Sequence, residues 1–522
     1  MHSYVQGASS ERAASAVGND PWPIRRLWAT GGIEDTARGR LVMAVVCAAL
    51  VAAPLLIVRF PPVTDLPQHV AQIRLFLAAW AGPDSGYRIQ WYTPYSAAYA
   101  FLGAAWALST PADAGRLALL ALAVVWMIAL HGLAARRHRP ASGAVLASVL
   151  FFNQTVYWGF LSFVMGWVAF VVWMLVTTAA PSERPGWRDA VRQFGAALLL
   201  YVSHALWFGL GAVWLLAYGL AHRWPRGTLL WRVGGVVPVG IAALVWYPHL
   251  EALGFVSPTV WLTPPLERLS PEWIVNALFG GIYGPSEPLL VALIATWVAA
   301  GWWSNRGALR AAADFDLLWT GLLLIALAFV LPDQYMNTVL FASRWMPWGA
   351  ILVIVAAPAP RLLGALQRPL ALATVAVFCL ATGLAWLRFE RNELSGLQAA
   401  LAALPDQQRV IGLDLVRDSD VIKGRPFLQT FAYAQVLHGG RLNMSFAGHA
   451  PSLVVYRRPE PAPWTPSLEW FAERVRASDL GYFDYALVNG GADIHAQAQR
   501  FPLVPVTSDG RWRLYKVTEA AR

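Results

Sequence analysis

One short motif combines residue types that can move a proton, the stretch 60–69 (FPPVTDLPQH). Pro67 suits an early helical position, so a helix is expected to begin beside it. Asp65 and His69 are four residues apart and would share one face of that helix with Gln72. A carboxylate beside a helix N-terminus is stabilised as the anion, and it can act as a general base or bind a cation. The alternative is that Asp65 only caps the helix, a role that Asp fills well.

Polar residues near the ends of apolar runs form a second set of candidates. Arg344 lies within the apolar run 340–357, where a charge is costly and marks a functional candidate. The planar fork of Arg suits phosphate, so a phosphate-binding role is predicted; the alternative is an ion pair with Asp333. A lone His near a helix end is more often a packing residue than a catalyst. The predicted substrate-binding residues are His69, His204, His249, Glu251, Asp333, Tyr335 and Arg344.

The composition places these residues in a membrane protein. Of the 522 residues, 57% are hydrophobic and 13% are charged, whereas a soluble domain carries about 25% charged residues. Between residues 41 and 387, apolar runs alternate with short loops, and runs of about 18 or more residues can cross a bilayer as helices. After Glu390 the composition becomes that of a soluble domain. Cys47 and Cys379 both lie in apolar runs, which argues against a disulfide framework.

These runs predict an all-α polytopic membrane domain of about eleven transmembrane helices, followed by a small C-terminal α/β domain. The polar segment 1–40 is predicted to be cytoplasmic and is too long for a typical cleaved signal. Residues 41–387 are the predicted transmembrane domain, with an outer loop at 59–116 that carries the acidic motif, and residues 388–522 are the extracytoplasmic domain. The spans are expected at 41–58, 117–135, 141–157, 160–180, 193–204, 205–221, 228–247, 288–303, 317–331, 340–357 and 369–387.

The arginines set the predicted orientation. With a cytoplasmic N-terminus and about eleven crossings, the basic segments all fall on the inner side. The formal charge of +10 therefore reflects topology and contact with anionic headgroups rather than nucleic acid, for which no aromatic-basic module is present. The inner basic segments are the N-terminal one with Arg25 and Arg26, then 136–139, 184–192, 223–232, 306–310 and 361–368.

One apolar stretch, 91–109, conflicts with a simple count of spans. If it crossed the membrane, the basic cluster 136–139 would lie outside, against the positive-inside bias. Its Tyr and Trp content suits an interface. It is therefore predicted to be an interfacial or re-entrant helix pair on the outer face.

The C-terminal segment alternates short predicted strands and helices. Strands are expected at 409–416, 452–456 and 485–488, and a hairpin at 503–517 turns around Asp509-Gly510. Helices are expected at 428–437 and 468–476. The segment has no phosphate loop, no GxSxG elbow and no dinucleotide fingerprint, so an accessory domain without a catalytic residue is predicted.

The order of these parts resembles the GT-C glycosyltransferases, which include protein O-mannosyltransferases, aminoarabinose transferases and oligosaccharyltransferases. The chain has a first span, a long outer loop opening on an acidic motif, many further spans and an outer C-terminal domain. The resemblance implies that Asp65 is the catalytic carboxylate and that the donor is a sugar on a polyprenyl phosphate. A divalent cation is a cofactor that the family admits. Several of its members carry a paired acidic motif here, whereas Asp65 has no neighbouring acid.

The sequence thus leads to a transferase that moves a sugar to a lipid, glycan or protein acceptor on the outer face of a membrane. Its Ala, Arg and Trp richness suggests the bacterial inner membrane. Two alternatives stay open. A transporter or flippase for a lipid-linked saccharide would share the basic, aromatic outer face, although no Asp or Glu falls inside a predicted span. A membrane scaffold whose C-terminal domain binds a partner is the other.

Overall fold

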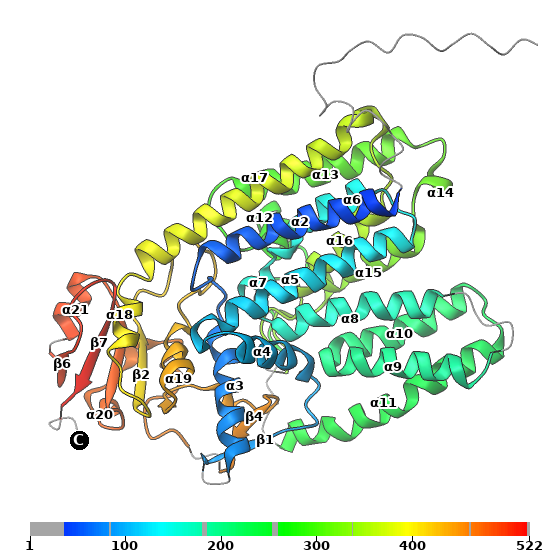
Figure 1. Ribbon diagram of the computed structural model, residues 1–522. Helices are drawn as coiled ribbons and strands as arrows, with labels where there is room; N and C mark the ends of the chain where they lie inside the picture. Colours follow the sequence, from blue (N-terminus) through cyan, green and yellow to red (C-terminus); the bar gives the residue numbers. More distant parts are fainter. Residues whose placement is uncertain are drawn as a thin grey trace, which may run out of the picture.

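The structure is a computed structural model, and it describes residues 36–82, 85–179, 185–252, 259–336, 338–458, 461–498 and 500–518. Long helices lie side by side in a bundle, and a small sheet covers one end of it (Figure 1). We call the end that carries the sheet the tail end, and the opposite end the far end. The fold class predicted from the sequence is confirmed at this level: a largely helical chain with a small C-terminal sheet region.

Helices occupy the positions of the predicted spans. Six helical segments of the described residues are long and apolar enough to cross a membrane: Ala37–Ile57, Pro111–Arg136, Leu161–Thr178, Arg226–Tyr247, Ser286–Ser304 and Arg361–Glu393. The other predicted spans correspond to shorter helices or to broken ones, so the count of eleven stays a prediction. The bundle helices are α2 (Ala37–Ile57), α5 (Pro111–Arg136), α8 (Leu161–Thr178), α9 (Trp187–Ser203), α10 (Ala205–Ala221), α11 (Arg226–Ala252), α13 (Ser286–Ser304), α15 (Phe315–Val330), α16 (Met346–Ala356) and α17 (Gln367–Arg388).

The predicted span 141–157 is not one helix. It divides into α6 (Ala141–Ala147), the 3-10 helix η2 (Ser148–Phe151) and the short α7 (Gln154–Tyr157). Asn153 begins α7 because its side-chain oxygen accepts hydrogen bonds from the backbone of Thr155 and Val156. The chain then turns at Gly159, whose φ is +82°, and enters α8.

The stretch 91–109 forms one helix, α4 (Ser96–Leu108), rather than the predicted pair. Its 13 residues rise about 20 Å, less than the hydrocarbon core of about 30 Å. The helix packs against α5 and against α3 (Leu66–Ala81), which follows the first bundle helix. That this stretch does not cross the bilayer stays a prediction.

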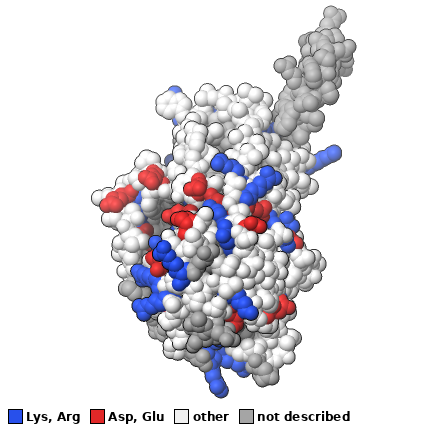
Figure 2. Space-filling view, turned by 90° about the vertical axis from the view of Figure 1, so that its left-hand side faces the viewer, with Lys and Arg blue, Asp and Glu red and all other residues white. Residues whose placement is uncertain are grey.

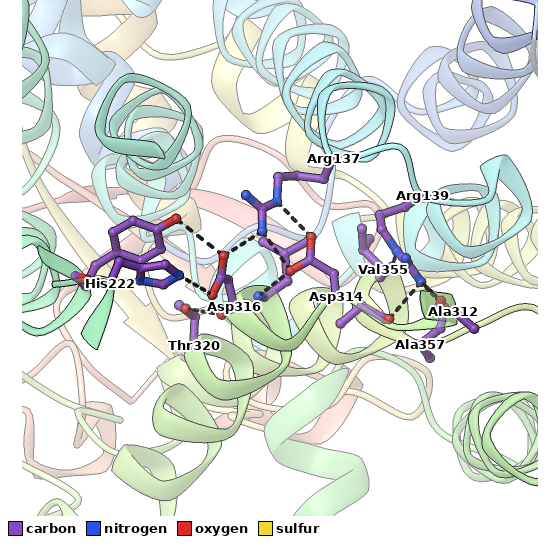
Figure 3. Close-up of polar contacts among 12 residues, drawn as sticks. Arg137, Arg139, His222, Ala312, Asp314, Asp316, Thr320, Val355 and Ala357 are labelled. Atoms are coloured by element: carbon purple, nitrogen blue, oxygen red, sulfur yellow. Dashed lines mark hydrogen bonds and ion pairs between the residues drawn. The ribbon is translucent and has the colours of Figure 1, made fainter. Parts of the chain in front are cut away.

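Basic side chains link the helices at the far end (Figure 3). Arg137, at the end of α5, forms a two-pronged ion pair with Asp314, the N-cap of α15, with N–O distances of 2.7 and 2.8 Å. The same guanidinium lies 2.8 Å from Asp316, whose other oxygen lies 3.2 Å from the His222 ring. The cluster therefore joins the ends of α5, α10 and α15.

Arg139 also links helices at the far end. We call Arg137, Arg139 and the carboxylates of Asp314 and Asp316 the far-end clamp. The Arg139 guanidinium is buried, and it donates to the carbonyl oxygens of Ala312, Val355 and Ala356 at 2.6, 3.2 and 2.9 Å (Figure 3). The last carbonyls of α16 have no partners inside the helix, so the cation satisfies them and interacts favourably with the helix dipole. Arg137 and Arg139 thus fix α15 and α16 relative to α5.

The C-terminal sheet has five strands in the order β3-β2-β5-β7-β6. Strand β2 is parallel to both β3 and β5, and β7 is antiparallel to β5 and β6. The predicted strands and the hairpin are therefore present, with the bounds β2 (Arg409–Asp414), β3 (Arg441–Leu442), β5 (Tyr485–Asn489), β6 (Leu503–Pro505) and β7 (Trp512–Val517). The predicted helix 428–437 is the 3-10 helix η7 (Thr430–Ala432) followed by α19 (Tyr433–His438).

The prediction of a helix at 468–476 is wrong, because only the 3-10 turn η9 (Ala472–Arg474) forms there. Leu468 and Ala472 are buried under the sheet, and this packing holds the segment without a regular helix. The strand at 452–456 forms as β4 (Val454–Tyr456), but it pairs with β1 (Tyr87–Ile89) from the first loop instead of joining the main sheet.

The C-terminal segment packs directly on the helical bundle. One face of the sheet has its own apolar core, whereas residues of the other face, such as Val410 and Leu487, belong to the same core as the bundle helices. Helix α3 lies between the two parts. The Gln68 side chain donates to Gln429 and accepts from the backbone of Phe446, and Gln72 accepts from the backbone of Val454.

An ion pair forms a second connection between the C-terminal segment and the helical bundle. Lys423 of the C-terminal segment donates to Glu287, at the start of α13, over 2.9 Å, and to Asn276 over the same distance. Glu287 is fully buried and also accepts from two backbone amides, Gly281 and Ile282. Viewed from the tail end, basic and acidic side chains are interspersed across the middle of the face (Figure 2).

The orientation across the membrane is tested by labelling cysteines introduced at His138 and Ser508. His138 is exposed at the far end and Ser508 is exposed in the loop between β6 and β7, while Cys47 and Cys379 are buried. Because the basic segments are expected inside, an impermeant thiol reagent added to intact cells should label the cysteine at 508 and not the one at 138. Equal labelling, or the reverse, would contradict the predicted orientation.

The far-end clamp should contribute to stability. Asp314→Ala removes a carboxylate that is 9% exposed together with both of its bonds to Arg137, so we expect a loss of about 2–3 kcal/mol in the free energy of unfolding. The control is Asp113→Ala, which removes the half-buried pair with Arg116, more accessible to solvent than Asp314, and should cost less than about 1 kcal/mol. Unfolding of the detergent-solubilised proteins measures both, and equal losses would argue against the clamp.

Candidate functional site

Asp65 stands at the N-cap position of α3 but does not cap it. Its backbone has φ −88° and ψ −3°, and its side chain makes no capping hydrogen bond. Pro67 lies in the first turn, as expected, so the helix start lacks one amide that would need a cap. Because an N-cap Asp normally accepts from the second or third helical amide, the carboxylate of Asp65 is free for another role.

An aromatic turn fixes the backbone of Asp65. The Thr64 amide donates to the carbonyl of Tyr157 over 2.9 Å, and the Asp65 amide donates to that of Trp158 over 3.1 Å. Gly159 follows with a positive φ, and a Cβ there would lie 2.7 Å from the Asp65 nitrogen. A side chain at Gly159 would therefore push the two segments apart, and only Gly permits this close approach.

Arg344 is the cation of the site. It lies in the 3-10 helix η4 (Ser343–Trp345) before α16 and is 4% exposed. Its Nε and Nη2 donate to the carbonyls of Leu340 and Val339. The guanidinium carbon stands 4.3 Å from the Phe160 ring centre and 5.2 Å from that of Phe163, within cation–π range. Among the described residues none accepts from Nη1, so one edge of the fork is left for a ligand.

Asp65 and Arg344 interact electrostatically. Burial raises the pKa of the Asp65 carboxyl to about 7, and the Arg344 guanidinium opposes this rise. Tyr95 and His204 lie beside this pair, with their rings 4.9 Å apart, and the His204 ring lies 5.1 Å from Phe163, one of the two rings that contact the guanidinium. The structure thus brings together Asp65, Arg344 and His204, which the sequence singled out, and adds Tyr95 and the aromatic turn.

His69 contacts side chains of two neighbouring elements. Its Nδ1 lies 3.1 Å from the Tyr99 hydroxyl of α4. Its ring also packs edge-on against Phe446, and Phe446 in turn lies against His449. Burial lowers the pKa of both His69 and His449 to about 4, so both are neutral at pH 7. Arg344 is therefore the cation that faces Asp65.

Asp333 and Tyr335 do not join this cluster. Asp333 pairs with the fully buried Arg268 over 2.9 Å and accepts from the backbone of Leu262 and Thr263, so it organises its own loop. The alternative of an Arg344–Asp333 ion pair is thus wrong. Tyr335 is 40% exposed and packs on Phe341.

Two predicted residues cannot be placed at the site. Helix α11 includes the positions of His249 and Glu251, but their side chains lie outside the described residues. A cavity of about 610 Å³ lies elsewhere, between Phe60, Glu390 and the start of α18 (Leu397–Ala402), and none of the predicted site residues lines it.

The side chains described at this site do not form the set of ligands that a dedicated metal centre needs. No group of three or more His, Cys, Asp or Glu side chains in the described part of the chain is arranged to hold a metal ion. Asp65 is the one acid of the cluster just described. A carboxylate that titrates near neutral pH, opposite a guanidinium held on aromatic rings, suits proton transfer from a hydroxyl beside a bound oxyanion.

The sequence did not reveal some residues of the site. Tyr95 and Tyr99 come from the stretch read as interfacial, where aromatic residues are expected for lipid contact alone. The sequence indicated a role for Gly159 only weakly, through its place as a glycine within the aromatic run 157–160 (YWGF). His449 lies in the segment for which no site residue was predicted. Scans against protein-family models and against curated proteins find no match to this chain.

The raised pKa of Asp65 predicts a pH-dependent stability. The folded protein holds this proton up to a pH of about 7, whereas the unfolded chain releases it near 3.8. Between these values the folded state binds more protons, so the free energy of unfolding falls as the pH rises. The unfolding temperature of Asp65→Asn should therefore increase relative to that of the wild type from about pH 4 to about pH 8. A constant difference would contradict the raised pKa.

Proposed function

We propose that this protein is a membrane glycosyltransferase of the GT-C type, with a polyprenyl-phosphate sugar as the donor. The observation that carries the proposal is that the carboxylate of Asp65 makes no capping bond and lies near enough to the buried Arg344 for the positive charge to lower its pKa. The order of span, acidic loop and C-terminal domain, which resembles that family, adds support.

In the proposed reaction, the acceptor hydroxyl oxygen attacks the anomeric carbon of the donor sugar. A bond forms between that oxygen and the sugar as the bond from the sugar to the phosphate breaks. Asp65 takes the hydroxyl proton, and the polyprenyl phosphate leaves with the electron pair. Arg344 stabilises the negative charge on the departing phosphate oxygen, a contribution that is often the largest single term in such reactions.

The proposal includes an orientation and a location. The tail end faces outward, the N-terminal segment is cytoplasmic, and the protein resides in a bacterial inner membrane. The gathering of basic segments at the far end supports this orientation, since Arg and Lys are enriched on the cytoplasmic side. Its partners are the polyprenyl-phosphate sugar, a lipid, glycan or protein acceptor, and the bilayer.

Substitution of the two charged residues should separate their roles. Asp65→Asn keeps the shape and removes the charge, so donor binding should survive while turnover falls by roughly 10²–10⁴-fold. Arg344→Lys keeps a charge but loses the fork, so it should weaken donor binding, though less than Arg344→Ala. Release of polyprenyl phosphate from the lipid-linked sugar measures turnover, and binding of the lipid is measured separately.

The matched controls are Asp113→Asn and Arg116→Lys, which alter a half-buried ion pair at the start of α5 and should leave turnover unchanged. Full activity of Asp65→Asn would refute the catalytic role, because an amide cannot take the proton of the acceptor hydroxyl. If the wild type moves a lipid-linked saccharide across vesicles without releasing polyprenyl phosphate, the protein is a flippase and the proposal fails.

A further inference from the structure

Strands β3, β2 and β5 of the C-terminal sheet are parallel, and β2 lies between the other two. The order of the strands reverses at β2, which makes it a topological switch point. From β2 the chain crosses one face of the sheet through η7 and α19 to β3, and it then returns to β5 on the other side of β2. The two connections cover opposite faces, since Phe431 belongs to the core shared with the bundle and Leu468 to the separate core. In open α/β sheets, ligands bind outside the carboxyl ends of strands at such a point.

Buried polar side chains stand where these strands end. Asp414 is the last residue of β2 and Asn489 the last of β5; they are 7% and 0% exposed. The Asn489 amide donates to Asp414 over 2.9 Å, but its oxygen is buried without a hydrogen-bond partner in the described structure. Burial raises the pKa of Asp414, and Arg425 is one of the groups that oppose the rise.

Two arginines border this edge. Arg417 donates to the carbonyl of Trp470 over 2.7 Å and lies 3.6 Å from Glu473, and Arg425 stands 5.9 Å from the centre of the Trp470 ring. The Nε atoms of Arg417 and Arg425 are both buried, and neither has a hydrogen-bond partner among the described residues. Buried donors and acceptors are nearly always satisfied in native proteins, so this concentration of open groups points to a ligand.

We propose that the carboxyl edge of β2 and β5 binds an acidic sugar, a hydroxylated ring that carries one oxyanion. The two guanidinium groups bind the oxyanion, because Arg suits carboxylate and phosphate. The free oxygen of Asn489 accepts from a ring hydroxyl, and the Trp470 side chain offers an apolar surface for the face of the ring.

The site is connected to Asp65 through one loop. Thr64, the neighbour of Asp65, donates through its hydroxyl to the carbonyl of Arg425 over 3.3 Å. Gly424 lies against Trp158, whose carbonyl holds the Asp65 amide. An acidic glycan bound at the sheet edge would thus extend toward Asp65 as the acceptor; this role, unlike the binding itself, rests on the proposed function.

Binding of simple sugars to the full-length protein in detergent tests the site. The probes are glucuronate, glucose 6-phosphate and neutral glucose. Calorimetry measures the binding of each sugar without any lipid donor. At least one of the two anionic sugars should bind, and glucose should bind at least about tenfold more weakly because it lacks the charge-assisted bonds. Comparison of the two anions shows whether a carboxylate or a phosphate is preferred.

Arg417→Gln and Arg425→Gln should each weaken the binding of the preferred anion by at least about tenfold. Arg417→Lys and Arg425→Lys keep the charge and should lose less, which gives an answer if a Gln variant does not fold. The matched control is Arg409→Gln, an arginine at the opposite edge of the same strand, paired with Asp484, and it should bind normally.

Asp65→Asn should also bind the preferred anionic sugar normally. The experiments therefore test the transferase proposal and the sugar site independently of each other. Full transferase activity of Asp65→Asn would leave the sugar site standing. An absence of anion-dependent binding in the wild type, or unchanged binding in both the Arg417 and Arg425 variants, would overturn the sugar site and show that the open groups are satisfied by water alone.

Discussion

The position of Asp65 depends on a backbone contact between two loops that are far apart in the sequence. The amides of Thr64 and Asp65 donate to the carbonyls of Tyr157 and Trp158, and the missing side chain of Gly159 lets the segments meet. These bonds fix the backbone of Asp65 at the start of α3, where its carboxylate makes no capping bond. The same turn carries Phe160, on which the Arg344 guanidinium rests. One contact therefore places the acid, and the turn that makes it supports the cation.

The C-terminal segment is part of this arrangement rather than an appendage. Through Gln68 and Gln72, α3 is bonded to it along one side, and Lys423 bonds it to Glu287. A loosened C-terminal sheet would therefore shift α3 and with it Asp65. At the far end, Arg139 holds the end of α16, whose opposite end follows Arg344. Both charged groups are thus positioned by elements that are far from them in the sequence.

Much of the helical arrangement could be predicted from the sequence, because long apolar runs have few alternatives in a bilayer. The candidate residues Asp65 and Arg344 could also be predicted, since charges within or beside apolar runs are rare. Their mutual position could not. It depends on the turn at Gly159 and on the single helix α4, and local patterns do not encode which distant segments meet. The helix expected at 468–476 failed for a related reason, since burial of Leu468 and Ala472 under the sheet outweighs their helical spacing.

The central claim is that the space between Asp65 and Arg344 binds the phosphate of a lipid-linked sugar. An experimental structure of the protein with a polyprenyl phosphate, in lipid nanodiscs, tests it most directly. We expect the phosphate within hydrogen-bonding distance of the Arg344 guanidinium, on the side of its free Nη1, with Asp65 facing the same space. A phosphate bound instead at the far-end cluster of Arg137 and Arg139, with the space beside Arg344 filled by protein side chains, would contradict the account.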